Sequence, residues 1–210
     1  MRRSVRYQVL AFCVVLLAGC SREKYESKPL AQQPQEAASS AIVTLQKLVN
    51  DQNYRSLGFQ TVDEVRQARL GEPLEVYIIG LEKLKNYRAG QDPNTLLVPS
   101  AETIYPVTVS GNVRTGVTII HKEQGYESSS FGQADVVKRL TLYRHDPSEF
   151  VVRIPAFNLY FIARHAEACI LLVPIANNPR LKAQAGESAP LNTIVEQLRP
   201  YIDSYNGISK

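Results

Sequence analysis

Hydrophobic positions along the chain recur with two spacings, which predict helices and strands in alternation. Apolar residues three and four positions apart are typical of amphipathic helices, and they occur at 40–50, 61–71, 81–90, 133–143 and 190–205. Short alternating or continuous apolar runs predict strands; they occur at 73–80, within 102–123, and at 150–154, 157–163 and 169–175. After residue 100 the element order is β-β-α-β-β-β-α, which is typical of an α+β fold, a mainly antiparallel sheet with helices packed on it.

The segment 102–123 predicts a β-hairpin that turns at Gly111-Asn112. A two-residue loop would mix apolar and polar side chains on one face, because side chains alternate along a strand. A three-residue loop, which pairs Ser110 with Arg114, avoids this and is the prediction. It gives one apolar face made of Tyr105, Val107, Val109, Thr115, Val117 and Ile119. Pro106 favours an edge position or a bulge in the first strand, because proline has no N–H to donate.

Several local signals predict where elements begin and end. Thr61 and Glu64 have the spacing of a capping box, and Gly71 suits a left-handed helix end. Pro200 should kink or break the last helix. The sequence GYESSSFG at 125–132 predicts a loop or a ragged strand.

The most unusual stretch of the domain is 153–175, which is dense in aromatic and aliphatic residues. Its segment 157–163 is apolar on both faces, which favours a central, buried strand. We interpret Phe157, Tyr160 and Phe161 as part of a core hairpin. The alternative is an exposed apolar edge or groove that accepts a peptide strand or an apolar ligand, rimmed by Arg153, Arg164 and His165.

The amino terminus has the layout of a secretory signal. Three arginines precede the apolar run Val9–Leu17, which is too short to span a bilayer, since a spanning helix needs about 20 residues. The sequence Leu17-Ala18-Gly19-Cys20 resembles the lipobox of bacterial lipoproteins. The alternatives are an ordinary signal peptide or an uncut signal anchor with an incidental cysteine.

The lipobox resemblance implies cleavage before Cys20 and attachment of acyl chains, including palmitate, to that residue. The partner would then be a membrane of the cell envelope, and an envelope protein is a further possible partner. In Gram-negative members of this family an aspartate after the cysteine often favours the inner membrane. Ser21 therefore favours the periplasmic face of the outer membrane.

These signals divide the chain into a signal peptide at 1–19, a polar tether at 20–38 and one globular domain at 39–210. The alternative to a tether is that this polar segment is a frayed start of the first helix. Removal of residues 1–19 removes three arginines and leaves 21 basic against 20 acidic residues, a net charge of +1. The basicity therefore belongs to the signal and gives no reason to expect a nucleic-acid partner.

Few residues of the domain indicate chemistry. Cys169 is the one cysteine left after Cys20 and the signal are set aside, and His165 lies close to it in sequence. The pair is a candidate for thiol chemistry, but a cysteine that opens the apolar run CILLVPI is more often a small buried hydrophobe. His121, His145 and His165 are scattered and lack metal-ligand spacing. Carboxylate pairs such as Glu123 with Glu127, or Asp146 with Glu149, are common by chance. We expect no metal and no cofactor.

Three functions remain open from the sequence. The first is a membrane-anchored lipoprotein with a non-enzymatic binding or envelope-associated role. The second is a hydrolase or thiol-dependent enzyme that uses Cys169 and His165. The third is a protease-regulating module, similar to a propeptide or inhibitor, that offers a sheet edge to a peptidase. The chain also resembles secreted bacterial lipoproteins that pair an LGEP segment, here 70–73, with a later sheet; this resemblance implies no particular activity.

Overall fold

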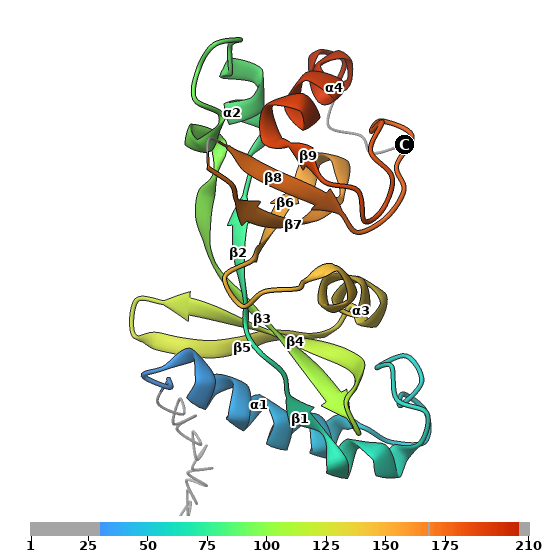
Figure 1. The fold of residues 1–210 in the computed structure, drawn as a ribbon. Coiled ribbons are helices and arrows are strands. Elements are labelled where there is room, and N and C mark those ends of the chain that lie inside the picture. The colour runs from blue at the N-terminus through green and yellow to red at the C-terminus, as the bar shows by residue number, and fades with distance from the viewer. Residues whose placement is uncertain (1–29, 168, 206–210) are drawn as a thin grey trace, which may run out of the picture.

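The computed structural model describes residues 30–167 and 169–205. The expected signal, Cys20 and most of the expected tether lie outside these residues. The described chain forms a nine-stranded sheet in the order β5-β4-β3-β2-β6-β7-β8-β9, with β1 paired to β3 (Figure 1). All neighbouring strands are antiparallel except β2 and β6, which are parallel. The predicted α+β class, with helices packed on a mostly antiparallel sheet, is confirmed.

The strands are β1 (Arg69–Leu70), β2 (Leu74–Ile78), β3 (Val98–Val109), β4 (Asn112–Lys122), β5 (Gly125–Gly132), β6 (Phe150–Ile154), β7 (Leu159–His165), β8 (Ile170–Pro174) and β9 (Ala189–Pro190). The α-helices are α1 (Pro34–Leu48), α2 (Leu81–Asn86), α3 (Ala134–Tyr143) and α4 (Leu191–Asp203). Three short 3₁₀ helices are η1 (Val62–Gln67), η2 (Pro93–Leu96) and η3 (Pro155–Phe157).

The twisted sheet is covered by helices on both faces. Helix α1 and η1 pack against β3 and β4, while α2 and α4 pack against β6, β7 and β8. Helix α3 packs against the opposite face, where residues of β2, β3, β6, β7 and the end of β8 meet. Figure 1 shows α3 between the two groups of strands, with α1 at one end of the molecule and α2 and α4 at the other.

Helix α1 is longer at its N-terminal end than the spacing of large apolar residues predicts. It begins at Pro34, so residues 34–38 of the expected tether are helical. Ala37 and Ala38 are buried with Leu45 against β4 and β5. Just before the helix, Ala31 exchanges two backbone hydrogen bonds with Tyr126 of β5, at 2.8 and 3.2 Å. The start of the described chain is therefore fixed to the edge of the sheet.

The predicted helix at 61–71 is shorter and is capped differently. It is the 3₁₀ helix η1, and the Thr61 side chain makes no capping hydrogen bond. The Glu64 carboxylate instead accepts a hydrogen bond from the Gln60 N–H at 2.6 Å. The chain then enters β1, and the Gly71 N–H donates to the Pro106 carbonyl at 2.7 Å. The predictions of a capping box and of a glycine helix end were wrong, because pairing with β3 takes over the C-terminal part of this segment.

The β3–β4 hairpin has the predicted apolar face but not the predicted loop. Val109 pairs with Asn112 across a two-residue turn, and Ser110 and Gly111 have φ values of 50° and 77°, as a tight hairpin turn requires. One extra residue, Arg114, then lies between the partners of Val107 and Thr108. This bulge shifts the register by one residue, as an odd loop would have done. All six residues of the predicted apolar face are buried.

The predicted odd loop was therefore wrong, while its consequence for the face was right. Pro106 lies in an interior strand, one residue before this irregularity, rather than at a sheet edge. The bulge rests on Gly58, whose φ is +92°. A Cβ atom at Gly58 would lie 2.0 Å from the Arg114 carbonyl oxygen.

The C-terminal half follows the sequence closely. Strand β7 lies between β6 and β8, as its two apolar faces predict. It begins at Leu159 rather than 157, because residues 155–157 form η3. The segment 125–132 is β5, a ragged edge strand with a register shift. Helix α4 continues through Pro200 to Asp203, so proline does not end it. Strand β5 agrees with the ragged-strand alternative for 125–132, and β9 is an addition to the predicted order.

Candidate functional site

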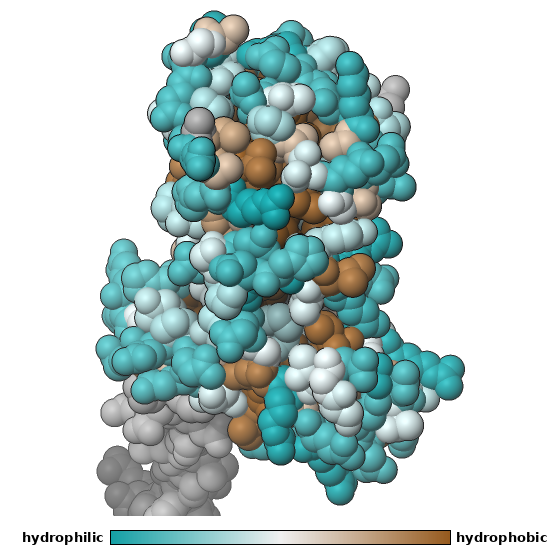
Figure 2. Space-filling model, viewed as in Figure 1, coloured by the Kyte–Doolittle hydropathy of each residue, from teal (hydrophilic) through white to brown (hydrophobic). Residues whose placement is uncertain are grey.

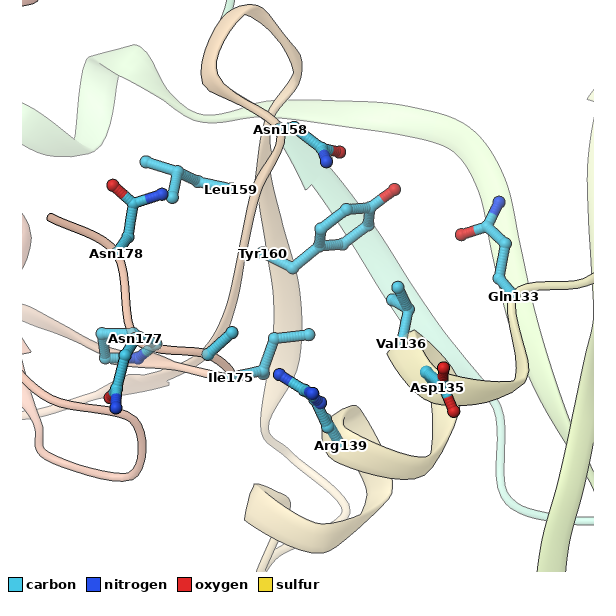
Figure 3. A pocket seen from close by; sticks show the side chains of 12 residues that line it. Gln133, Asp135, Val136, Arg139, Asn158, Leu159, Tyr160, Ile175, Asn177 and Asn178 are labelled. Carbon is cyan, nitrogen blue, oxygen red and sulfur yellow. The ribbon is translucent and has the colours of Figure 1, made fainter. Parts of the chain in front are cut away.

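A cleft between the N-terminal part of α3 and the ends of β7 and β8 is the candidate functional site. Its volume is about 410 Å³, within the range of about 300–1,000 Å³ that is typical of small-molecule sites. Its apolar walls come from Val136, Leu159, Pro174, Ile175 and Ala176. Figure 3 shows the Tyr160 ring extending from β7 into the space before α3, and Arg139 extending from α3 toward Ile175.

Two residues of the cleft have a left-handed backbone. Gln133 has a φ of 54° and immediately precedes α3, and Asn158 has a φ of 51° and immediately precedes β7. Residues other than glycine adopt this conformation seldom, although asparagine does so more readily than most. In each case the chain turns there from one element into the next. The turns place both carboxamide side chains at the cleft.

The Tyr160 side chain is held by neighbours outside the cleft. The guanidinium carbon of Arg153, its partner on β6, lies 5.2 Å from the centre of the Tyr160 ring, which is a cation–π contact. Arg153 Nη1 lies 3.7 Å from a carboxylate oxygen of Glu102 on β3. Because the cation is itself placed by an acid, the ring is kept in position from one side.

The loop after β8 forms the other wall of the cleft and is stabilised by its own asparagines. The side-chain oxygen of Asn177 accepts from the Ala185 N–H at 2.7 Å. The side-chain oxygen of Asn178 accepts from the Arg180 N–H at 3.0 Å. These bonds leave the NH₂ group of each carboxamide as a donor.

Cys169 and His165 lie on either side of the tight turn between β7 and β8, as their short separation in the sequence predicts. Ala166 and Cys169 exchange backbone hydrogen bonds of 2.8 and 3.4 Å between β7 and β8. Cys169 is half-buried. In the described chain no hydrogen bond joins its thiol to the imidazole, and the His165 ring lies beside Phe150, with ring centres 5.4 Å apart. The geometry lacks the contact by which a histidine activates a thiol.

Three of the four carboxylates considered from the sequence have structural partners. Glu127 forms an ion pair with Lys122. Glu149 is buried and accepts hydrogen bonds from the backbone N–H groups of His145 and Asp146, at 2.7 and 3.2 Å. Hydrogen bonds from the Ser148 side chain and backbone lower the pKa of the exposed Asp146 carboxyl. These acids therefore order the turn before β6 and the β4–β5 hairpin rather than face each other across a cleft.

The aromatic stretch divides between core and cleft. Phe157 and Phe161 are buried, as the core interpretation predicts, whereas the half-buried Tyr160 lines the cleft. The proposed rim does not assemble. Arg153 lies beside Tyr160. Arg164 is four residues after Tyr160 along β7, which places it roughly 13 Å from Tyr160. His165 points to the opposite face of the sheet from Arg164, because side chains alternate along a strand.

The third hypothesis needs a sheet edge that can pair with a peptide strand. Strand β4 is covered by β5 along most of its length, so its edge is not available to a peptide strand. The edges of the sheet path are β5 and the two-residue β9.

Sequence reasoning singled out Tyr160, but chiefly as a core residue, and it missed Arg139, Gln133 and the three asparagines of the cleft. They come from segments far apart in the chain and meet only because α3 packs on β7 and β8. Polar residues at the ends of elements, such as Gln133 after Gly132 and the Asn177-Asn178-Pro179 turn, are the signal that could have pointed to them.

His121 and His145 are exposed, as expected. Within 30–167 and 169–205, no group of three or more histidine, cysteine, aspartate or glutamate residues is placed to hold a metal ion. None of the helices described is long and apolar enough to cross a membrane. The chain matches no protein-family model, no curated protein and no solved structure.

Proposed function

We propose that this protein is a bacterial lipoprotein, anchored through Cys20, that holds an α+β domain at the periplasmic face of the outer membrane and binds an envelope component there without catalysing a reaction. The observation that carries the proposal is the order of basic residues, short apolar run and Leu17-Ala18-Gly19-Cys20. Such an order is typical of an exported chain, and acylation of its cysteine would supply a stable membrane attachment.

The position of the domain relative to Cys20 supports this role. Leu30 lies ten positions after Cys20, and ten positions of fully extended chain reach at most about 36 Å. Ala31 is then bonded to β5. A domain tethered in this way stays close to the membrane surface, where its cleft meets components of the envelope.

Metabolic labelling with an alkyne analogue of palmitate tests the anchor. We expect label on the wild-type protein and on Cys169→Ser, and none on Cys20→Ser. Cys169→Ser is the matched control, because it removes the other cysteine of the mature chain. An unlabelled wild-type protein, or label that persists in Cys20→Ser, contradicts the proposal.

Fractionation of the envelope tests the location. We expect the wild-type protein in the outer membrane and Ser21→Asp in the inner membrane, because aspartate after the lipidated cysteine favours retention there. Equal distribution of both proteins contradicts the outer-membrane assignment and leaves the labelling result unaffected.

A further inference from the structure

Four polar side chains of the cleft are free to contact a ligand. Gln133, Arg139, Asn158 and Tyr160 have side chains with no hydrogen bond or ion pair to any other residue in the described chain. They come from the start of α3 and the start of β7, on the two sides of the cleft. A ligand between these elements would be within reach of both groups.

The free groups are mainly hydrogen-bond donors. Arg139 has five N–H groups and no acceptor, and Asn177 and Asn178 have already used one side-chain oxygen lone pair each in the loop. Asp135 is the one acidic residue that lines the cleft. Figure 3 shows Arg139 extending away from Asp135, toward Ile175. An excess of donors favours a ligand rich in oxygen acceptors.

Arg139 is also the one cation that lines the cleft. Arg180, on the neighbouring loop, has its guanidinium over the rings of Phe157 and Tyr201, at 5.8 and 5.6 Å from the ring centres. Lys138 does not line this cleft and lies instead at a neighbouring pocket beside α3. A guanidinium binds a carboxylate through two parallel hydrogen bonds. One such group in the cleft matches a ligand with one carboxylate.

The remaining surface suits a hydroxylated ring. The Tyr160 ring gives a flat apolar surface with a polar hydroxyl at its end, and the contact with Arg153 holds it in place. The carboxamides around it both donate to and accept from hydroxyl groups. On these grounds we propose that the cleft binds a small sugar that carries a carboxylate, with Arg139 paired to the carboxylate and Tyr160 packed against the ring.

This proposal rests on the proposed function, because it takes the domain to be a binding domain. It does not depend on the lipid anchor at Cys20. The ligand has two possible sources, a free sugar acid or the muramic acid of the cell-wall polymer. Both share the carboxylate and the hydroxylated ring.

Calorimetric titration of the mature lipoprotein, purified in detergent, tests the inference. N-Acetylmuramic acid and N-acetylglucosamine form a matched pair that differs in the lactyl carboxylate, and D-glucuronate and D-glucose form a second pair. We expect an acid to bind with a Kd of about 1 mM or tighter and its neutral partner about tenfold more weakly or worse, since hydrogen bonds to charged groups are the stronger ones. Binding of N-acetylmuramic acid alone assigns the ligand to the cell wall, and binding of both acids assigns it to sugar acids in general.

Arg139 and Lys138 are exposed neighbours on α3, so substitutions at these two positions can be compared directly. Arg139→Gln should lose the preference for acids, whereas Lys138→Gln, which alters a cation outside the cleft, should keep it. Absence of binding by both acids, equal binding of acids and neutral sugars, or an unchanged preference in Arg139→Gln overturns the inference. Palmitate labelling of the same protein is read separately, so failure of the ligand and failure of the anchor are distinguishable.

Discussion

Replacement of Gly58 by alanine tests the support of the β3–β4 bulge. Gly58 has a φ of +92°, and an added Cβ would lie 2.0 Å from the Arg114 carbonyl oxygen, far inside the 3.4–4 Å of ordinary contact. Gly90 is a matched control, because its φ is +88° and an added Cβ would meet nothing within 4 Å. The two substitutions share the backbone cost and differ in the clash.

The magnitudes follow from these two terms. A left-handed backbone costs alanine about 1–2 kcal/mol, and the reduced freedom of the unfolded chain returns about 0.4–1 kcal/mol. Gly90→Ala should therefore destabilise the protein by about 0–1.6 kcal/mol. Gly58→Ala adds the strain of an overpacked contact, about 1–3 kcal/mol, so we expect a total loss of about 1–5 kcal/mol.

Urea denaturation followed by circular dichroism measures both losses. The difference between the two variants should be at least about 1 kcal/mol, a magnitude that a shift of the urea midpoint resolves at unchanged slope. If Gly58→Ala is no more destabilising than Gly90→Ala, the Arg114 carbonyl does not rest on Gly58 and the account of the bulge is wrong.

Three further predictions concern ion pairs and titration. Arg114 Nη2 and Glu64 Oε1 are 2.9 Å apart, and their side chains are 17% and 16% exposed. A double-mutant cycle with Arg114→Gln and Glu64→Gln should therefore give a coupling free energy of about 1–2 kcal/mol, between the values of exposed and buried ion pairs. Additive losses of stability would contradict the pairing. Ser148→Ala removes the side-chain hydrogen bond that most lowers the pKa of Asp146, so that pKa, followed by NMR, should rise toward 3.8, and an unchanged value would show that the hydroxyl is not the cause. Burial raises the pKa of Tyr105 above 10.0, so Tyr105 ionises in the unfolded chain before it ionises in the folded protein as the pH rises. The stability that this residue contributes is therefore complete below pH 10 and lost above it. The variant Tyr105→Phe should lose less stability than the wild type between pH 9 and 11, and equal losses would refute the assignment.

The elements with a strong period were readable from the sequence. Amphipathic spacing located α3 and α4 within a few residues, and the two-faced apolar run at 157–163 correctly predicted a central strand. The face of the β3–β4 hairpin was also determined locally, because burial of alternate apolar side chains allows one parity only. Residues 17–20 predict the lipid attachment from local chemistry alone, and that remains a prediction.

Long-range contacts decided the rest. The bulge at Arg114 replaced a three-residue loop because Gly58 leaves room for the bulged carbonyl and Glu64 pairs with the side chain. Pairing of β1 with β3 overrode the helix signal before Gly71.

The candidate cleft exists only in the tertiary structure. Arg139, Tyr160 and Asn177 belong to three elements that are separate along the chain, and the packing of α3 on β7 and β8 brings them together. Local sequence determines which face of an element is apolar, since that depends on a period of two or 3.6 residues. It does not determine which elements meet, because that depends on the total burial and hydrogen bonding of the whole sheet. Most of this domain's surface is hydrophilic in the view of Figure 2, so polarity alone does not distinguish the donors of the cleft from other surface side chains.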